Sequence, residues 1–219
     1  ETLQQTIETL NFGLKSKVEF NILVINDHSE DGTLQLLEIL SRTYSNFYSF
    51  SNDKNKGVGN AIRFGLSKYK GDIVSICMAD GSDSVEDILQ SYYKIVNEDF
   101  DCVFGSRFIL GGQITNYPKI KLIFNRIFNK YVQWRSSNNY NDFTNIFKTY
   151  RRSAINQIMP LSSEGFSIGL EMSLKAFKNK FEIAIIPISW KQRTAGESKL
   201  KLSKNFRLYM NTLRSCLKK

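Results

Sequence analysis

The feature that most constrains the fold is a repeated order of apolar runs, polar turns and amphipathic helices. Residues 20–25 (FNILVI) and 73–78 (IVSICM) are almost entirely apolar, which is typical of strands buried on both faces of a parallel sheet. Each run is followed by an acidic turn and then by apolar residues at helical spacing. This alternation predicts an α/β fold with a mostly parallel sheet flanked by helices.

The same patterns predict the remaining elements. Further strands are expected over 47–50, 101–105 and 183–190, and Pro187 should confine the last of these to an edge or a bulge. Asp31 is expected to cap the helix that follows it. Apolar residues at helical spacing predict helices over 1–12, 34–40, 61–69, 85–96, 119–135 and from 202 onward.

Scarce residue types exclude several kinds of site. With one histidine, His28, the chain has no multi-histidine metal centre, and a triad built on His is disfavoured. The three cysteines, Cys77, Cys102 and Cys216, are too few and too scattered for a disulfide framework, which favours a reducing, cytoplasmic setting. No apolar run reaches the roughly 18 residues that a membrane-spanning helix needs.

Charge is distributed unevenly along the chain. Residues 1–110 hold 10 basic and 16 acidic side chains, whereas residues 111–219 hold 20 basic and 5 acidic ones. The acidic half could hold a metal cation, and the basic half could face phosphates, a membrane surface or nucleic acid. A solubilising surface charge is the alternative.

Residues 119–135 combine an apolar stripe at helical spacing with five lysines and arginines. Such a basic amphipathic helix could lie in a membrane interface, or it could pack against the core with one side in solvent. A second basic amphipathic helix is expected over 201–219, where it could also face a membrane. We therefore expect one main domain over 1–200 and this helix after it.

Asp80 and Asp83 follow the predicted strand 73–78 within one short turn (ADGSD). Two carboxylates on a turn repel each other, so both stay ionised most readily around a cation. Oxygen ligands favour Mg²⁺ or Mn²⁺, and Mg²⁺ commonly binds few carboxylates together with substrate phosphates. The pair therefore predicts a metal site, and capping of the next helix is the alternative.

Three further segments suggest substrate contacts. Asp27 follows the first strand and could accept hydrogen bonds from a base or a ribose, although an Asx-turn would also explain it. Gly57 belongs to a glycine-rich loop that opens a helix and could lie near phosphate or ribose. The basic loop that contains Arg193, Ser198 and Lys199 could bind a diphosphate, or it could be an exposed charged loop.

Taken together, these motifs resemble glycosyltransferase family 2, in particular its branch of polyprenyl-phosphate (dolichyl-phosphate) sugar synthases. The resemblance covers nearly the whole chain. It is carried by VINDHSEDGT (24–33), NKGVGNA (55–61), MADGSD (78–83), GSRFILGG (105–112), DFTNIFKTYRR (142–152), EGFSIGLE (164–171) and PISWKQRTAGESKL (187–200).

The resemblance implies a GT-A fold and an inverting transferase that uses a nucleotide-diphosphate sugar and Mg²⁺ or Mn²⁺. The acceptor would be a polyprenyl phosphate at the cytoplasmic face of a membrane, with the enzyme attached peripherally and no nucleic-acid partner. Three departures from the family pattern stand out. The family's first strand is missing, Met78 stands in place of the first carboxylate of the D-x-D motif, and Asn26 replaces the first aspartate of a D-D pair.

Under this interpretation, Asp80 and Asp83 hold the metal, and Arg107, Arg193 and Lys199 hold phosphates. An acceptor phosphate is already anionic and needs no strong base, whereas a sugar hydroxyl would need one. Glu171 is then the candidate base, with a structural ion pair as its alternative. Three other functions remain open: transfer to a glycan or other soluble acceptor, a non-catalytic basic binding module, and a family member inactivated at Met78.

Overall fold

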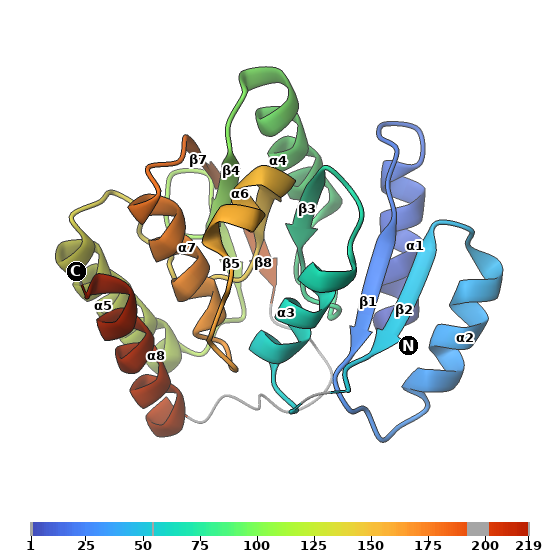
Figure 1. Cartoon of the computed structure of the whole chain (residues 1–219), viewed down its shortest axis with the longest axis horizontal. Helices are drawn as coiled ribbons and strands as arrows, with labels where there is room; N and C mark the ends of the chain where they lie inside the picture. The colour runs from blue at the N-terminus through green and yellow to red at the C-terminus, as the bar shows by residue number, and fades with distance from the viewer. Residues whose placement is uncertain (1, 54, 192–201, 219) are drawn as a thin grey trace.

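The computed structural model describes residues 2–53, 55–191 and 202–218. Its strands form the centre of the molecule, with helices on both sides (Figure 1). The predicted α/β class and the GT-A-like arrangement are confirmed.

A parallel pair of strands forms one end of the structure. β1 (Ile22–Asn26) pairs with β2 (Phe47–Ser51), and α1 (Thr2–Leu14) and α2 (Thr33–Thr43) pack on it through a shared apolar cluster. Gly32, not Asp31, occupies the N-cap position of α2. The predicted cap position is therefore wrong by one residue. The Asp31 carboxylate nevertheless accepts a hydrogen bond from the amide of Thr33 (3.1 Å), the first residue of α2.

The main sheet has four strands in the order β3-β6-β4-β7. β3 (Ile73–Ile76), β4 (Cys102–Ser106) and β7 (Ile183–Pro187) share one direction, and β6 (Lys148–Arg151) runs antiparallel between β3 and β4. The sequence did not predict β6, because a four-residue run with three polar side chains lacks the apolar pattern of a buried strand.

Pro187 acts as predicted at the end of an edge strand. The predicted strand 183–190 is in fact two strands, because β7 stops at Pro187 and β8 (Ser189–Lys191) leaves the main sheet. β8 then pairs in parallel with β5 (Gln113–Thr115).

Alternate residues of β4 face the two sides of the main sheet. Cys102 and Phe104 belong to the large core cluster, to which α6 (Arg152–Ile158) and α7 (Ile168–Lys178) contribute. Val103 faces the opposite cluster, which contains Ile95 of α4 (Val85–Glu98). The sheet is therefore covered on both faces, as its apolar strands require.

In the described part of the chain, no strand pairing joins the β1-β2 sheet to the four-stranded sheet, whose nearest strand in the sequence is β3. Among the described residues β1 and β3 each pair along one edge only, and most of their residues are half-buried. β4, which pairs along both edges, is fully buried. On the β1 side, α3 (Val58–Lys68) packs against β1.

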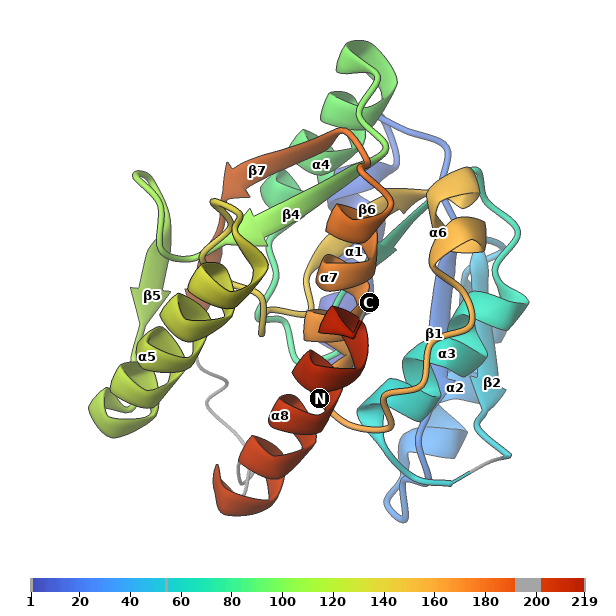
Figure 2. The same cartoon turned by 60° about the vertical axis from the view of Figure 1, so that its left-hand side comes forward.

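Two long helices lie at the far end from β1 and β2, where Figure 2 shows them in front. α8 (Leu202–Leu217) packs against α7 and buries Leu213. α5 (Lys119–Ser136) contacts α8 through the Phe128 ring, whose centroid lies 5.3 Å from that of Tyr209. None of the helices in the described part of the chain has the length and hydropathy of a membrane span.

Candidate functional site

The acidic turn follows β3 at its carboxyl end, where ligands bind in open α/β sheets. The Met78 amide donates to Asp83 Oδ2 (2.8 Å), and the Ser82 amide donates to Asp80 Oδ1 (3.1 Å). Gly81, between the two acids, has a φ of 70° that favours glycine. These hydrogen bonds fix both carboxylates on one turn.

Asp83 lies in an unusual electrostatic environment for a carboxylate. Burial raises its pKa to about 7, and the negative charges of Asp80 and Asp87 add to the effect. The Met78 amide and the positive charge of Arg107 oppose this rise. A partly buried carboxylate among like charges is stabilised in its ionised form by a cation, so this turn fits a divalent metal.

The donor set at this turn is small. Among the described residues, no three acidic, histidine or cysteine side chains are close enough together to hold a metal by themselves. A site completed by substrate phosphates fits this finding, because Mg²⁺ commonly takes only one or two protein carboxylates beside a nucleotide.

Met78 and Asn26, which stand where the family pattern has aspartates, both have a structural explanation. The Met78 side chain packs against the large core cluster, where a carboxylate would lose its hydration. Asn26 is buried, and its side-chain oxygen accepts from the Ser29 amide (3.1 Å). An aspartate could accept the same hydrogen bond, but burial penalises its charge and favours the neutral side chain.

Arg107 is placed by a partner that the sequence analysis did not single out. Its Nε and Nη2 donate to the two oxygens of Asp142 at 2.8 and 2.7 Å, and its own amide donates to Asp142 Oδ2 at 3.0 Å. Both side chains are buried. Burial alone would lower the pKa of Arg107, but the Asp142 carboxylate outweighs it and raises the pKa further.

Aromatic rings surround the rest of the Arg107 guanidinium. Its central carbon lies 5.2 Å from the ring centroid of Phe108, 5.8 Å from Tyr117 and 5.9 Å from Trp190. Because Asp142 takes two of the five N–H donors, the remaining donors can still bind an oxyanion. Arg107 is thus a pre-oriented cation within electrostatic reach of Asp83.

Lys148 of β6 is a second cation near this pair, and it is fully buried. Its ammonium donates to the Asn145 carbonyl and lies 5.4 Å from the ring centroid of Phe104. Burial lowers the pKa of Lys148 to about 7, against the opposing influence of Asp142. Arg107 already neutralises Asp142, so the Lys148 charge is poorly compensated.

Lys148→Met is therefore expected to stabilise the protein by about 1–4 kcal/mol at pH 6.5. The folded pKa lies below the unfolded value of 10.5, so the unfolded chain binds more protons between about pH 7 and 10.5. Wild-type stability should rise with pH across this window, and the gain of the variant should shrink. Urea unfolding at pH 6.5 and 9.5 measures both effects. Lys15→Met, at an exposed lysine, is the control, and an equal gain there would contradict the explanation.

Asp27 and Gly57, predicted separately to contact substrate, lie together. The Gly57 amide donates to Asp27 Oδ2 (2.9 Å), and the Asn52 side chain donates to Asp27 Oδ1 (3.0 Å). Both carboxylate oxygens thus hold the glycine-rich loop against the end of β1. His28, the next residue, has a φ of 59° and lies in a bend after β1.

The glycines of this loop are required by close packing. A Cβ on Gly57, which has a φ of 152°, would lie 2.5 Å from the Glu164 carbonyl oxygen. The Gly59 and Asn60 amides donate to that same carbonyl at 2.9 and 3.3 Å. The first turn of α3 therefore uses these donors within the protein, and a phosphate contact by Gly57 stays a prediction.

Gly59→Ala is expected to cost about 1–3 kcal/mol of stability, as overpacking of a rigid contact does. The added Cβ would lie 2.7 Å from the Glu164 carbonyl carbon and closer still to the Ser163 carbonyl oxygen. Thermal unfolding measures the loss. Gly32→Ala is the matched control, because no atom lies within 4 Å of its Cβ position. Equal melting temperatures for the two variants would show that segment 163–164 can move away.

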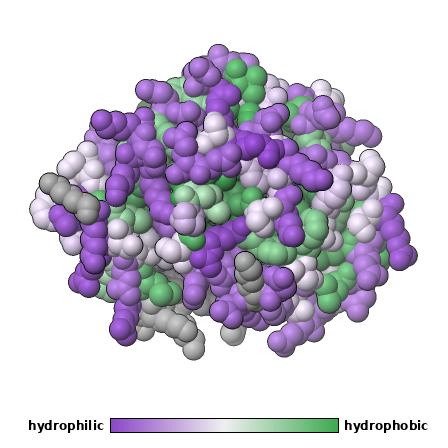
Figure 3. Space-filling view, in the orientation of Figure 1, coloured by the Kyte–Doolittle hydropathy of each residue, from purple (hydrophilic) through white to green (hydrophobic). Residues whose placement is uncertain are grey.

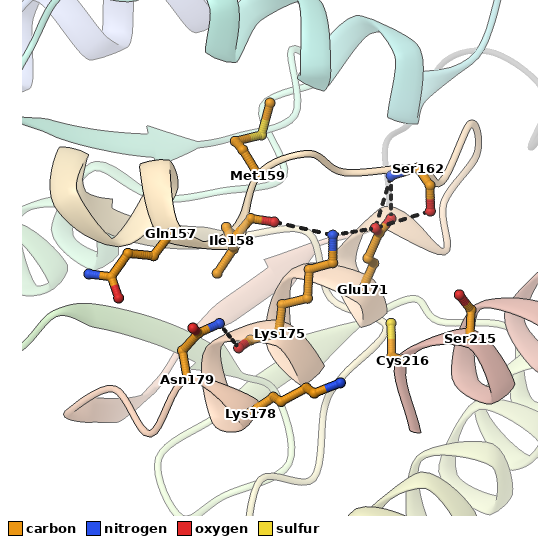
Figure 4. A pocket seen from close by; sticks show the side chains of 10 residues that line it. All are labelled: Gln157, Ile158, Met159, Ser162, Glu171, Lys175, Lys178, Asn179, Ser215 and Cys216. Atoms are coloured by element: carbon orange, nitrogen blue, oxygen red, sulfur yellow. Dashed lines mark hydrogen bonds and ion pairs between the residues drawn. The ribbon is translucent and has the colours of Figure 1, made fainter. Parts of the chain in front are cut away.

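Glu171, the candidate base, is anchored in a different contact. Its carboxylate accepts from the amides of Ser162 (2.9 and 3.0 Å) and Ser163 (2.7 Å), and Lys175 Nζ lies 3.1 Å away. Burial alone would raise the pKa of Glu171, but these donors outweigh it and lower the pKa. Figure 4 shows the group beside a cavity of about 270 Å³ between α6, α7 and α8.

The structure thus places Asp80 and Arg107 each within electrostatic reach of Asp83, and it brings Asp27 into contact with Gly57. Asp142 is the residue that the sequence analysis missed, although it lies in one of the motifs that carried the resemblance. Arg193, Ser198 and Lys199 lie outside the described residues.

Known proteins that are similar to this chain include the following three. A polyprenol monophosphomannose synthase of Mycolicibacterium smegmatis is 28% identical over 188 residues, which cover 83% of this chain and 71% of the relative. An undecaprenyl-phosphate mannosyltransferase of Micrococcus luteus is 25% identical over 188 residues, covering 83% and 76%. Glucosyl-3-phosphoglycerate synthase of Mycobacterium tuberculosis, in a crystal structure with Mn²⁺, uridine-diphosphate-glucose and phosphoglyceric acid, superposes with a TM-score of 0.67. That match covers 96% of this chain and 74% of the other at 15% identity, so it shows the fold.

Comparison of the sequence with profiles of known families agrees with the resemblance. A sequence profile described as glycosyl transferase family 2 matches residues 1–159 of the 219 residues. Because this match spans well over half of the sequence, the chain belongs to glycosyl transferase family 2.

Proposed function

We propose that this glycosyltransferase moves a sugar from a nucleotide-diphosphate donor to a polyprenyl phosphate at a membrane surface, with inversion at the anomeric carbon. The observation that carries this proposal is the similarity, over 83% of the chain, to two proteins named for mannosyl transfer to polyprenyl phosphates. The basic second half of the chain supports an acceptor that presents phosphate in a membrane.

On the donor side, Asp80 and Asp83 would hold Mg²⁺ or Mn²⁺, since both carboxylates lie on the turn that follows β3. When bound, this ion would neutralise the negative charge that develops on the departing nucleoside diphosphate. Asp27 would contact the nucleoside from its position beside Gly57. Arg193, Ser198 and Lys199 would bind phosphate from the basic loop.

On the acceptor side, Arg107 would orient the phosphate through the N–H donors that Asp142 leaves available. An acceptor phosphate oxygen is already anionic, so the attack needs no proton transfer to a base. Glu171, the candidate base for a hydroxyl acceptor, accepts hydrogen bonds from Ser162 and Ser163 and pairs with Lys175. Because these contacts already occupy the Glu171 carboxylate, it is poorly placed to take a proton from a hydroxyl acceptor. This favours the phosphate acceptor, which needs no base.

Attachment to the membrane would be peripheral and on the cytoplasmic face. All three cysteines are unpaired, and a reducing compartment would keep them so. Residues 201–219, which include α8, would contribute a basic surface that faces the lipid.

The decisive experiment measures transfer from a panel of radiolabelled nucleotide-diphosphate sugars to short prenyl phosphates, with Mg²⁺, Mn²⁺ or EDTA. We expect product with one donor, dependent on metal and acceptor. Transfer only to a soluble acceptor such as phosphoglyceric acid would favour the alternative acceptor class. Donor binding in Mn²⁺ without any transfer would indicate an inactive family member. Absence of donor binding would favour a non-catalytic basic module.

A further inference from the structure

α5 has an inner and an outer apolar face. Phe128 and Val132 point inward and are buried. Five large apolar side chains on the other side of the helix are between 57% and 72% exposed: Ile120, Ile123, Phe124, Ile127 and Trp134. We call these five residues the outer face of α5.

This outer face is unusual for a protein surface. The side of the molecule seen in Figure 1 is mostly hydrophilic, and its apolar groups appear as small separate patches (Figure 3). On α5 the exposed apolar residues recur at helical spacing and form one stripe. Phe206 of α8, whose ring packs against Phe128 on the inner side of α5, is also 58% exposed. Contiguous apolar surface of this kind marks an interaction site.

The charges beside the outer face indicate what it binds. α5 contains five lysines and arginines and no aspartate or glutamate. Of the basic residues, Lys119, Arg126, Lys130 and Arg135 are exposed. A second copy of this chain would bring the same positive charges close together across a two-fold interface, which is unfavourable. A surface that is apolar with negative headgroups complements the helix in both respects.

We propose that the outer face of α5 docks onto an anionic phospholipid bilayer, with the helix axis in the plane of the membrane. The apolar side chains would enter the boundary between headgroups and acyl chains, and the exposed lysines and arginines would contact lipid phosphates. Trp134 is well suited to this boundary, since its ring is apolar and its N–H is polar.

This docking would also place the acceptor near the site, an aspect that rests on the proposed function. The Arg126 guanidinium lies 4.2 Å from the ring centroid of Phe108, the residue next to Arg107. A helix is only about 10 Å thick, so a phosphate at the headgroup level would be close to Arg107. The enzyme would then take a lipid acceptor without lifting it out of the bilayer.

Flotation of the full chain with vesicles tests the docking without donor or acceptor. We expect binding to vesicles of phosphatidylglycerol and phosphatidylcholine, and binding at least tenfold weaker to phosphatidylcholine alone. Ile123→Ser combined with Ile127→Ser should weaken binding to the anionic vesicles tenfold or more. Phe12→Ser on α1 is the matched control, because Phe12 is 92% exposed and lies on another helix. It should bind like the wild type.

Several results would overturn the proposal. The wild type could fail to bind the anionic vesicles, or it could bind neutral and anionic vesicles equally. The double variant could bind the anionic vesicles as tightly as the wild type does. A wild-type dimer in light scattering that the double variant abolishes would assign the outer face to a second copy instead.

An assay of sugar transfer to a short, water-soluble prenyl phosphate separates the docking proposal from the proposed function. The double variant should keep that activity and lose transfer to a vesicle-bound acceptor, whereas an enzyme with no transfer in either assay would refute the proposed function alone.

Discussion

Asp80→Asn is expected to lower kcat/KM for sugar transfer about a thousandfold, because a metal at a departing diphosphate supplies several kcal/mol. The amide keeps the shape and one oxygen of the carboxylate but removes the charge that would hold the ion. Asp80 is only half-buried, and its one described hydrogen bond comes from the neighbouring Ser82 amide. The melting temperature should therefore change little. Initial rates across a Mn²⁺ titration, with thermal unfolding of the same sample, measure both quantities.

Glu86→Gln is the matched control for this variant. Glu86 lies six residues further along, is exposed, and belongs to the first turn of α4. Glu86→Gln removes one negative charge near the acidic turn but outside the proposed metal site. It should therefore leave both the transfer rate and the metal requirement unchanged. Wild-type rates in Asp80→Asn would remove Asp80 from the proposed metal site.

Local pattern was sufficient to predict most of the fold. The apolar runs at 20–25 and 73–78 and the periodic segments at 85–96 and 119–135 became β1, β3, α4 and α5, with ends shifted by a few residues. The sequence analysis did not predict β5, α6 and α7. Two further features were missed because they depend on distant partners. β6 is short and polar, and it forms only because β3 and β4 each offer it an edge. The separation of β1 from β3 depends on which strands pair, which no local pattern encodes.

The candidate site was predictable to a similar extent. The position of Asp80 and Asp83 after a strand follows from local sequence alone. The pairing of Arg107 with Asp142 does not, since 35 residues separate them. The glycine-rich loop also has a role that local sequence did not indicate, because Gly57 and Gly59 lie against the backbone of residues 163–164. The predicted phosphate contact of Gly57 stays a prediction. Backbone contacts between distant segments leave no periodic signal.

Asp142→Ala is expected to lower the free energy of unfolding by about 3–5 kcal/mol, because it leaves the Arg107 guanidinium buried without its partner. Both side chains of the pair are less than 10% exposed, at 7% and 0%. For a domain of this size, the loss corresponds to a fall in melting temperature of about 6–20 °C. Glu98→Ala, which breaks the exposed pair with Lys94, should cost less than about 1 kcal/mol. Thermal and urea unfolding compare the two.

A double variant separates the structural role of the pair from its role in transfer. Arg107→Met combined with Asp142→Leu removes both charges and fills the volume with apolar atoms, so it should be more stable than Asp142→Ala alone. If Arg107 also orients a phosphate, this stable double variant should still show a large loss of kcat/KM with prenyl phosphate. Recovery of stability together with wild-type transfer would confine Arg107 to the fold. A double variant as unstable as Asp142→Ala would instead mean that the amide of Arg107, which also donates to Asp142, is the contact that matters.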